Sequence, residues 1–200
     1  MLDRFYPIVP DVQWLERLLF WGVKLVQLRI KDDSPASIRA QISRGLALAK
    51  RWDCQLIVND YWQDAIDLGA DFIHLGQEDL DQADVAAIRR AGIKIGVSTH
   101  DEAELERGLS TDPDYVALGP IYATTVKKMS WAPQGLTRLG EWRKRIACPL
   151  VAIGGITLES APAVYTAGAD SIAVVTDIVR HPDPRMRTGQ WLQQRLTWSR

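Results

Sequence analysis

Cysteine is scarce in this chain, and a long uninterrupted apolar run is missing. The two cysteines, Cys54 and Cys148, lie far apart and lack the spacing of a zinc-binding or redox motif. No stretch approaches the ~18 consecutive apolar residues of a transmembrane helix, and the amino terminus lacks the basic segment and apolar run of a secretory signal. We therefore expect a reduced, cytoplasmic protein that is neither exported nor inserted into a membrane.

An excess of charge of one sign is also lacking. The chain has 24 Lys and Arg against 25 Asp and Glu, which gives a net charge of -1. Such a balance creates no global field that attracts nucleic acid or an anionic membrane, so any anion must be bound by a local group of charges. We expect no nucleic-acid partner. The hydrophobic fraction of 46% is enough for one sizeable core and favours a single domain over residues 1–200.

Short apolar runs alternate along the chain with segments of helical spacing. We expect eight strands, at residues 5–9, 25–30, 56–59, 72–75, 93–98, 115–119, 150–154 and 171–175. Apolar strands joined by helices are typical of a parallel sheet covered by helices, and eight such units in about 200 residues reach the lower size limit of a TIM barrel. We predict this α/β, (β/α)8 fold. The alternative is an open doubly wound sheet, whose G-x-G-x-x-G turn is missing after the first strand.

Polar side chains follow several of the expected strands, at the end where a barrel of this kind carries its chemistry. Gln27, Arg29 and Lys31 share one face of the second strand because side chains alternate with a period of two. The other polar or glycine positions near strand ends are Asn59, Asp60, His74, Gln77, Glu78, Asp79, Ser98, Thr124, Thr125, Lys127, Lys128, Gly154, Gly155 and Thr176.

Two of these residues, Asp60 and Asp79, are carboxylates that follow neighbouring strands. We expect their oxygens within reach of one Mg²⁺, an ion that commonly takes one or two protein carboxylates and completes its shell with water and phosphate oxygens. Arg29, Lys31 and Lys127 would then hold the remaining phosphate charge. The sequence therefore predicts a hard divalent ion beside a highly charged anion.

Some of these residues also have a purely structural explanation. The alternative for Asp60 is a cap on a helix beginning at Tyr61, and the alternative for Asp79 is a cap on a helix near Asp84, because Asp is a common cap. His74 lies within a strand, where a buried, hydrogen-bonded histidine is as common as a catalytic one. We assign His74 to binding only.

A second anion site is expected at the other side of the barrel mouth. Gly154 and Gly155 follow the seventh strand and expose backbone N–H groups, and the run 174–176 leads into a short helical segment. Loops after the seventh and eighth strands form the recurrent phosphate site of this fold. The alternative is a tight turn that requires glycine.

Seven segments resemble the thiamine phosphate synthase family, in the family's order and over nearly the whole chain. They are QLRIK at 27–31, LIVND at 56–60, HLGQEDL at 74–80, GVSTH at 96–100, LGPIYATTVKK at 118–128, AIGGI at 152–156 and GADSIAVVT at 168–176. The resemblance implies an enzyme that joins a hydroxymethylpyrimidine diphosphate to a thiazole phosphate, and releases pyrophosphate and thiamine phosphate.

The same resemblance implies roles for individual residues. It implies that Asp60 and Asp79 bind Mg²⁺. It implies a part in catalysis for Arg29, Lys31, Ser98 and Lys127. The residues implied to contact the pyrimidine diphosphate are Gln27, Leu28, Arg29, Ile30, Lys31, Asn59, Ser98 and Lys127, with His74 added as a binding residue. Those implied to surround the thiazole phosphate are Thr124, Thr125, Val126, Gly155, Val175 and Thr176.

Three residues depart from the family's pattern. Ala123 replaces a common proline, Thr176 replaces a common serine, and Val126 replaces a common threonine. Val126 matters most, because it removes one hydroxyl donor to the thiazole or its phosphate. Thr125 is a neighbouring hydroxyl that could compensate.

Two other functions remain as alternatives. A thiazole tautomerase is a related barrel that isomerises the thiazole, carries a catalytic histidine where this chain has Pro120, and lacks the carboxylate pair. A non-catalytic thiamine-phosphate sensor would keep the pocket without turnover. The sequence leaves the oligomeric state open, a homo-oligomer included.

Overall fold

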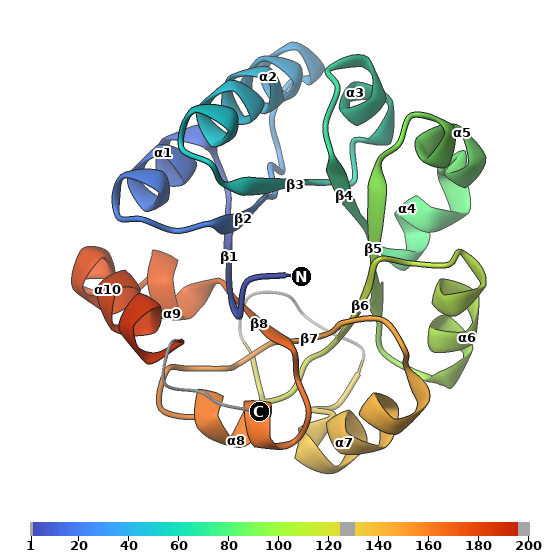
Figure 1. Ribbon diagram of the computed structural model, residues 1–200, viewed down its shortest axis with the longest axis vertical. Helices are drawn as coiled ribbons and strands as arrows, with labels where there is room; N and C mark the ends of the chain where they lie inside the picture. Colours follow the sequence, from blue (N-terminus) through green and yellow to red (C-terminus); the bar gives the residue numbers. More distant parts are fainter. Residues whose placement is uncertain (1, 125–130, 196–200) are drawn as a thin grey trace.

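The computed structural model describes residues 2–124 and 131–195, which form a closed barrel of eight parallel strands. Each strand pairs with the next along the chain, and β8 pairs with β1 (Figure 1). The strands are β1 Phe5–Val9, β2 Leu25–Leu28, β3 Gln55–Asn59, β4 Phe72–Leu75, β5 Lys94–Thr99, β6 Tyr115–Leu118, β7 Leu150–Ile153 and β8 Ser171–Val174. The predicted single-domain (β/α)8 barrel is confirmed, and the doubly wound alternative is wrong.

Helices surround the barrel as an outer ring (Figure 1). Within the described residues they are α1 Val12–Phe20, α2 Pro35–Arg51, α3 Trp62–Asp67, α4 Gln77–Gln82, α5 Val85–Arg90, α6 Glu102–Ser110, α7 Gly135–Arg145, α8 Ala161–Thr166, α9 Thr176–Val179 and α10 Pro184–Gln194. Side-chain caps begin several of them; the Asp11 carboxylate, for example, accepts from Trp14 N at 2.8 Å at the start of α1. No helix among the described residues is long and apolar enough to cross a membrane.

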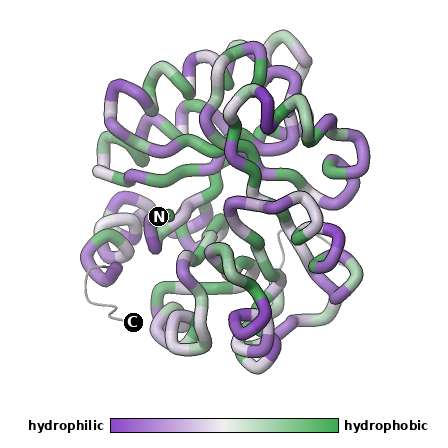
Figure 2. The backbone as a smooth tube through the Cα atoms, turned by 45° about the vertical axis from the view of Figure 1, so that its right-hand side comes forward, coloured by the Kyte–Doolittle hydropathy of each residue, from purple (hydrophilic) through white to green (hydrophobic). Residues whose placement is uncertain are grey.

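The apolar core has two layers because every strand alternates its side chains between two faces. One layer lies between the strands and the helices, and the other fills the barrel itself with residues such as Ile57, Phe72 and Val151. Figure 2 shows the hydrophobic strands running through the middle of the molecule. Leu2 packs against the inner layer, and the amino terminus lies within the ring of strands in Figure 1.

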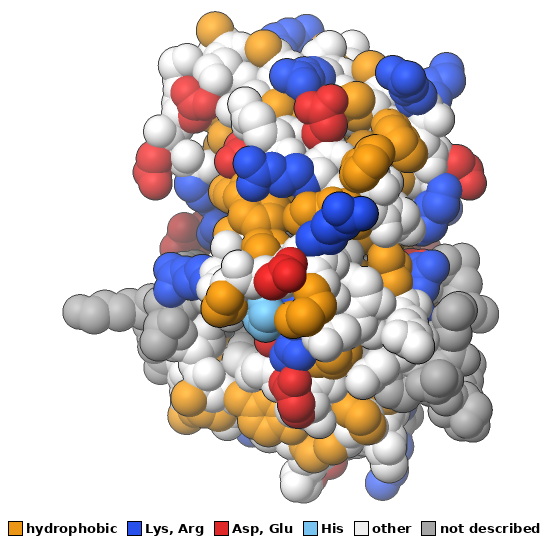
Figure 3. Space-filling view, turned by 90° about the vertical axis from the view of Figure 1, so that its left-hand side faces the viewer, with side chains coloured by type: hydrophobic (Ala, Val, Ile, Leu, Met, Phe, Trp, Pro, Cys, Tyr) orange, Lys and Arg blue, Asp and Glu red, His pale blue; other side chains and the backbone are white. Residues whose placement is uncertain are grey.

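The interior of the barrel is therefore packed rather than hollow, which leaves the ends of the strands as the place for a site. On the outer face drawn in Figure 3, basic, acidic and hydrophobic side chains are interspersed. This mixture agrees with the balanced net charge of -1.

Candidate active site

The two predicted metal-binding carboxylates meet at the ends of β3 and β4. Asp60 directly follows β3, and Asp79 lies in the first turn of α4, which begins two residues after β4. The two side chains are close enough to hydrogen bond. Lys31 joins them from the end of β2, with its Nζ 2.5 Å from Asp60 Oδ2.

The structural explanations for both aspartates are wrong. The N-cap residue of α3 is Tyr61, not Asp60, and it makes no side-chain cap hydrogen bond. Asp84 itself caps α5, by accepting from Ala87 N at 2.8 Å. Asp60 instead has a left-handed backbone, with φ of 67°, a conformation that is uncommon for residues other than Gly, Asn and Asp.

Electrostatics support a cation at this cluster. Burial, together with the nearby charge of Asp60, raises the pKa of Asp79 from 3.8 to about 6, and Lys31 opposes the rise. A divalent cation between the two carboxylates would remove this obstacle to the ionisation of Asp79. Their hard oxygen donors suit Mg²⁺, which needs only one or two of them. Asp60 and Asp79 therefore fit the predicted ion.

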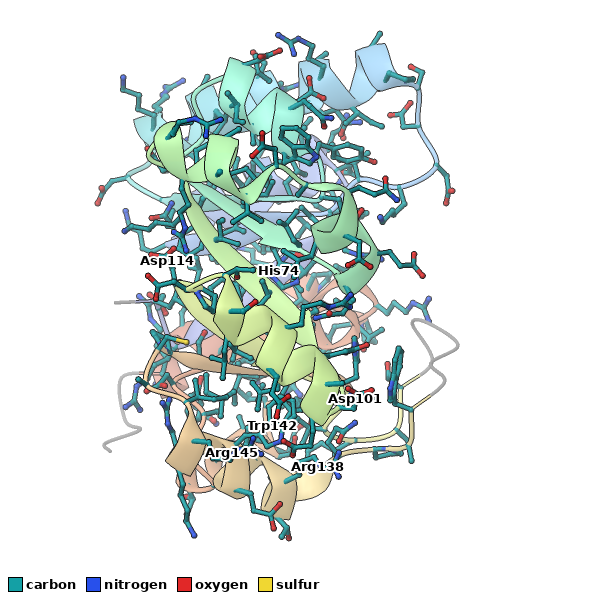
Figure 4. All side chains as sticks on the ribbon, turned by 90° about the vertical axis from the view of Figure 1, so that its right-hand side faces the viewer. His74, Asp101, Asp114, Arg138, Trp142 and Arg145 are labelled. Carbon is teal, nitrogen blue, oxygen red and sulfur yellow. The ribbon has the colours of Figure 1, made fainter. Side chains whose placement is uncertain are left out.

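A chain of hydrogen-bonded side chains lies inside the barrel behind this cluster. Gln27 Nε2 donates to Tyr6 Oη at 2.7 Å, and the Tyr6 and Tyr115 hydroxyls are 2.9 Å apart. His74 continues the chain, with Nδ1 2.6 Å from Tyr115 Oη and Nε2 2.7 Å from Ser98 Oγ. The predicted residues Gln27, His74 and Ser98 are thus brought together. Figure 4 shows His74 in the interior, between Asp114 towards one end of the barrel and Asp101 towards the other.

His74 is held neutral in this chain. Burial, with smaller contributions from Arg29 and His100, lowers its pKa from 6.5 to about 4, and Asp60 opposes the shift. Both partners of its ring nitrogens are hydroxyls rather than carboxylates. His74 therefore supplies a hydrogen-bonding ring and no positive charge.

Asn59 is a buried amide near the same mouth. Its side chain lies on the same face of β3 as Ile57, which belongs to the inner layer. The residue is 3% exposed, and its Nδ2 has no hydrogen-bond partner among the described residues. A buried donor of this kind needs an explanation, and a ligand acceptor is one.

Two predicted binding residues of β2 and its end, Leu28 and Ile30, turn their side chains away from the barrel interior. They are 1% and 2% exposed and belong to the layer beneath the helices. A substrate at the mouth could reach only their backbone atoms. Arg29, between them, shares the inward face with Gln27 and is partly exposed.

A cavity of about 280 Å³ opens after β6, β7 and β8. Its lining includes the predicted residues Thr124, Gly155 and Thr176, together with Ala123, Ile156, Thr157 and Asp177. Gly155 has φ of 68°, and a Cβ atom there would lie 2.5 Å from Ala123 O. Glycine is therefore required for both the conformation and the close approach. Val175 precedes α9 and packs against the inner layer.

The cavity rests on an ion-pair network that the sequence did not reveal. Asp177 accepts two hydrogen bonds from Arg187 of α10, at 2.9 and 2.8 Å, and one from Trp191 Nε1 at 2.7 Å. It also accepts from Leu158 N at 3.2 Å. One carboxylate thus ties the loop after β7 to the start of α9. Arg187 completes a bidentate pair with Glu159, at 2.7 Å for both bonds.

Four residues of the predicted site, Thr125, Val126, Lys127 and Lys128, lie outside the described residues. Their assignments stay predictions from the sequence. The segment that contains them begins after Thr124, which lines the cavity, and ends before Trp131.

Fold and site together define a barrel enzyme of phosphorylated substrates, with a carboxylate and lysine cluster on one side of the mouth and a glycine-lined cavity on the other. Comparison with known proteins names the family. Residues 5–178 match the family described as thiamine monophosphate synthase. This chain belongs to that family, and it is a transferase-class enzyme of thiamine biosynthesis.

Individual relatives agree with the family match. A thiamine-phosphate synthase of Rhizobium etli is 61% identical over 198 residues, which cover 98% of this chain and 97% of the relative. One from Salmonella schwarzengrund is 49% identical, over 94% of this chain and 89% of the relative. The solved thiamine phosphate pyrophosphorylase from Pyrococcus furiosus superposes with a TM-score of 0.84 at 26% identity, over 98% of this chain and 96% of that one.

Proposed function

We propose that this protein condenses 4-amino-2-methyl-5-(diphosphooxymethyl)pyrimidine with a thiazole phosphate to give thiamine phosphate and pyrophosphate. The observation that carries the proposal is the pairing of a carboxylate and lysine cluster with a glycine-lined cavity at one barrel mouth. Asp60, Asp79 and Lys31 suit a diphosphate with its metal ion, and the cavity at Gly155 suits a single phosphate. A reaction between a diphosphate and a monophosphate needs both.

The diphosphate belongs at the carboxylate side in this proposal. Asp60 and Asp79 would hold Mg²⁺, which when bound neutralises the diphosphate and stabilises the charge that develops on it. Arg29, Lys31 and Lys127 would contact the phosphate oxygens as the leaving group departs. Gln27, Asn59, His74 and Ser98 would orient the pyrimidine ring, and Leu28 and Ile30 would contribute backbone atoms only.

The chemistry asks for position and electrostatics rather than a general base. The carbon–oxygen bond to the diphosphate breaks, and both electrons leave with the oxygen. The aminopyrimidine ring delocalises the positive charge left on its methylene carbon. The lone pair of the thiazole nitrogen then forms the new carbon–nitrogen bond, and no proton has to be removed. The protein contributes by holding the two rings in line.

The thiazole phosphate belongs at the cavity. Thr124, Thr125, Val126, Gly155, Val175 and Thr176 are the residues we assign to it. Support comes from the left-handed Gly155, which brings backbone close to the space a phosphate would fill. Thr124 and Thr176 line the same space, and threonine hydroxyl groups suit phosphate oxygens.

One assay separates this proposal from its alternatives. The purified protein is mixed with both phosphorylated substrates, with and without Mg²⁺, and the products are measured. Thiamine phosphate and pyrophosphate that form only with Mg²⁺ support the synthase. Isomerised thiazole without condensation would indicate a tautomerase, which Pro120 in place of the catalytic histidine already disfavours. Tight binding without any product would indicate a sensor.

We also propose that the protein works in the cytoplasm. Support comes from Cys54 and Cys148, which are both free in the structure. Whether the protein is a homo-oligomer is decided by its mass in solution.

A further inference from the structure

The hydrogen-bonded chain inside the barrel contains two phenols that have no assigned role, Tyr6 and Tyr115. Both rings are 1% exposed or less. Tyr115 is the middle member, and the barrel is built around it: Gly96 lies opposite Tyr115 in the β5–β6 register, and a Cβ atom there would lie 2.1 Å from the ring. The Tyr115 and His74 rings are stacked, with centroids 5.6 Å apart.

The number of protons on each group determines which residue donates each hydrogen bond in this series of side chains. The Gln27 amide nitrogen can only donate, so Tyr6 Oη accepts from it. Tyr6 has one proton, and the acceptor it faces is Tyr115 Oη at 2.9 Å. Tyr115 also has one proton, and it faces His74 Nδ1 at 2.6 Å. Each tyrosine hydroxyl therefore accepts a hydrogen bond from the previous residue and donates one to the next residue.

His74 completes the sequence of donors. A neutral imidazole carries one N–H. Because Nδ1 accepts the hydrogen bond from Tyr115, that N–H must be on Nε2. Nε2 then donates to Ser98 Oγ at 2.7 Å. Among the described residues Ser98 Oγ bonds only to His74, so its hydroxyl proton is left for an acceptor at the mouth.

We propose that Tyr115, supported by Tyr6, is a positioning residue that sets the Nε2–H tautomer of His74 and thereby turns Ser98 into a hydrogen-bond donor towards the substrate. The inference rests on the proposed function only for the identity of that substrate. With the unpartnered Nδ2 of Asn59, Ser98 gives the mouth two neutral donors. Neutral donors suit the ring nitrogens of a pyrimidine, whereas a diphosphate calls for cations.

The alternative is that every hydrogen bond in this series runs in the opposite direction. If the Gln27 amide were turned by half a rotation, its oxygen would accept from Tyr6, and every later bond would reverse. His74 would then carry its proton on Nδ1, and Ser98 would donate to His74 rather than to the substrate. The tautomer of His74 therefore reports the direction of the whole chain.

Nitrogen NMR of the imidazole measures this tautomer in the full chain without substrate. The protein has three histidines, and His74→Gln identifies the signals that belong to His74. At about neutral pH we expect an unprotonated Nδ1 and a protonated Nε2. In Tyr115→Phe the donor to Nδ1 is gone, and we expect a shift towards the Nδ1–H form. Tyr6→Phe should shift it less, because Tyr115 keeps its hydroxyl.

Kinetics then connect the tautomer to the reaction. Tyr115→Phe should raise KM for the pyrimidine diphosphate about tenfold, the size of one lost neutral hydrogen bond, with KM for the thiazole phosphate unchanged. Tyr165→Phe is the matched control. Its hydroxyl donates to Arg4 O at 2.5 Å, away from His74, and its loss should leave the tautomer and both KM values unchanged.

Two results overturn the proposal: a wild-type protein with the Nδ1–H tautomer, or a folded Tyr115→Phe variant whose tautomer is that of the wild type. If Tyr115→Phe does not fold, the shift in Tyr6→Phe decides in its place. The NMR spectra are recorded without turnover. A protein that makes no thiamine phosphate would therefore contradict the proposed function, while the tautomer of His74 could still be measured.

Discussion

The ammonium of Lys31 lies 2.5 Å from a carboxylate oxygen of Asp60 at the ends of β2 and β3. Without a metal ion, Lys31 is therefore the cation that balances Asp60, while Asp79 is left with a raised pKa. A metal ion that took both carboxylates, as we propose, would compete with Lys31 for the same oxygen. Lys31 would then be free to turn to a diphosphate, so we expect metal binding and phosphate binding to favour each other.

The first prediction concerns the carboxylate pair. Asp60→Asn and Asp79→Asn should each lower turnover by roughly 10²-fold or more, because a neutral amide is a poor ligand for a hard cation and leaves the departing diphosphate less neutralised. Asparagine is preferable to alanine at Asp60, whose φ is 67°, because asparagine tolerates the left-handed conformation.

The control for that prediction is Asp67→Asn. This residue pairs with Arg39 on the surface, and its side chain is 58% exposed. Turnover should stay at the wild-type level in this variant. Steady-state kinetics over a range of Mg²⁺ concentrations check all three proteins, and normal turnover in the double variant Asp60→Asn, Asp79→Asn would refute the metal assignment.

The second prediction concerns pH. The pKa of Asp79 is about 6 in the folded protein and 3.8 in its ordinary state, so between these values the folded protein binds more protons than the unfolded chain. Stability contributed by this group is therefore full below about pH 4 and falls as pH rises to about 6. The difference in unfolding midpoint between the wild type and Asp79→Asn, measured without metal, should follow this window.

Magnesium should reverse that trend, because it binds the ionised carboxylate. The rise in unfolding midpoint that Mg²⁺ causes should be larger at about pH 7.5 than at about pH 5. In Asp79→Asn the Mg²⁺ effect should be small at both values. An equal Mg²⁺ effect in both proteins would place the ion elsewhere.

The barrel, and the position of several candidate site residues at its mouth, could be predicted because their signals are local. Apolar strands alternate with helices, and the period of two alone put Gln27 of β2 and Arg29 just after it on one face. The usual place of phosphate sites in this fold put Gly155 and Thr176 at a common cavity. The resemblance to the family did not separate Leu28 and Ile30, whose side chains lie beneath the helices, from the inward-facing Arg29 between them.

Other features had no local signal. Helix α4 buries only Leu80, so its six residues show no helical periodicity and were expected only as polar residues after a strand. Tyr6 and Tyr115 are 109 positions apart, and Asp177 meets Arg187 because α10 packs against α9 (Figure 1). A tyrosine on the inner face of a strand is the one hint, because a buried hydroxyl needs a partner.

The third prediction concerns the cavity. Gly155→Ala should raise KM for the thiazole phosphate and lower stability by about 1–3 kcal/mol, through backbone strain at positive φ and the close contact with Ala123 O. Gly189→Ala in α10 is the control, because open space surrounds its Cβ position. That change should stabilise the helix by about 0.5–1 kcal/mol. Chemical denaturation and kinetics with each substrate varied in turn check both variants.

The fourth prediction concerns Val126, which lies outside the described residues. Val126→Thr restores the hydroxyl that the family commonly has, and it should leave turnover intact or lower KM for the thiazole phosphate. KM for the pyrimidine diphosphate should not change, because that substrate is assigned to the other side of the mouth. A rise in KM for the pyrimidine diphosphate alone would mean that the two substrates are assigned to the wrong sides.

The last prediction concerns the support beneath the cavity. In Arg187→Gln, the carboxylate of Asp177 loses its ion partner while its side chain stays 8% exposed. Removing one partner of a buried ion pair costs about 3–5 kcal/mol. The loop at Leu158, whose backbone N–H donates to Asp177, is then held less firmly. We expect a lower free energy of unfolding and a higher KM for the thiazole phosphate.

The control is Arg44→Gln, which removes a surface ion pair with Glu16. The Arg44 side chain is 53% exposed, so the loss should cost less than about 1 kcal/mol of stability. If both variants lose the same stability and keep the same KM values, Asp177 and Arg187 do not support the phosphate site.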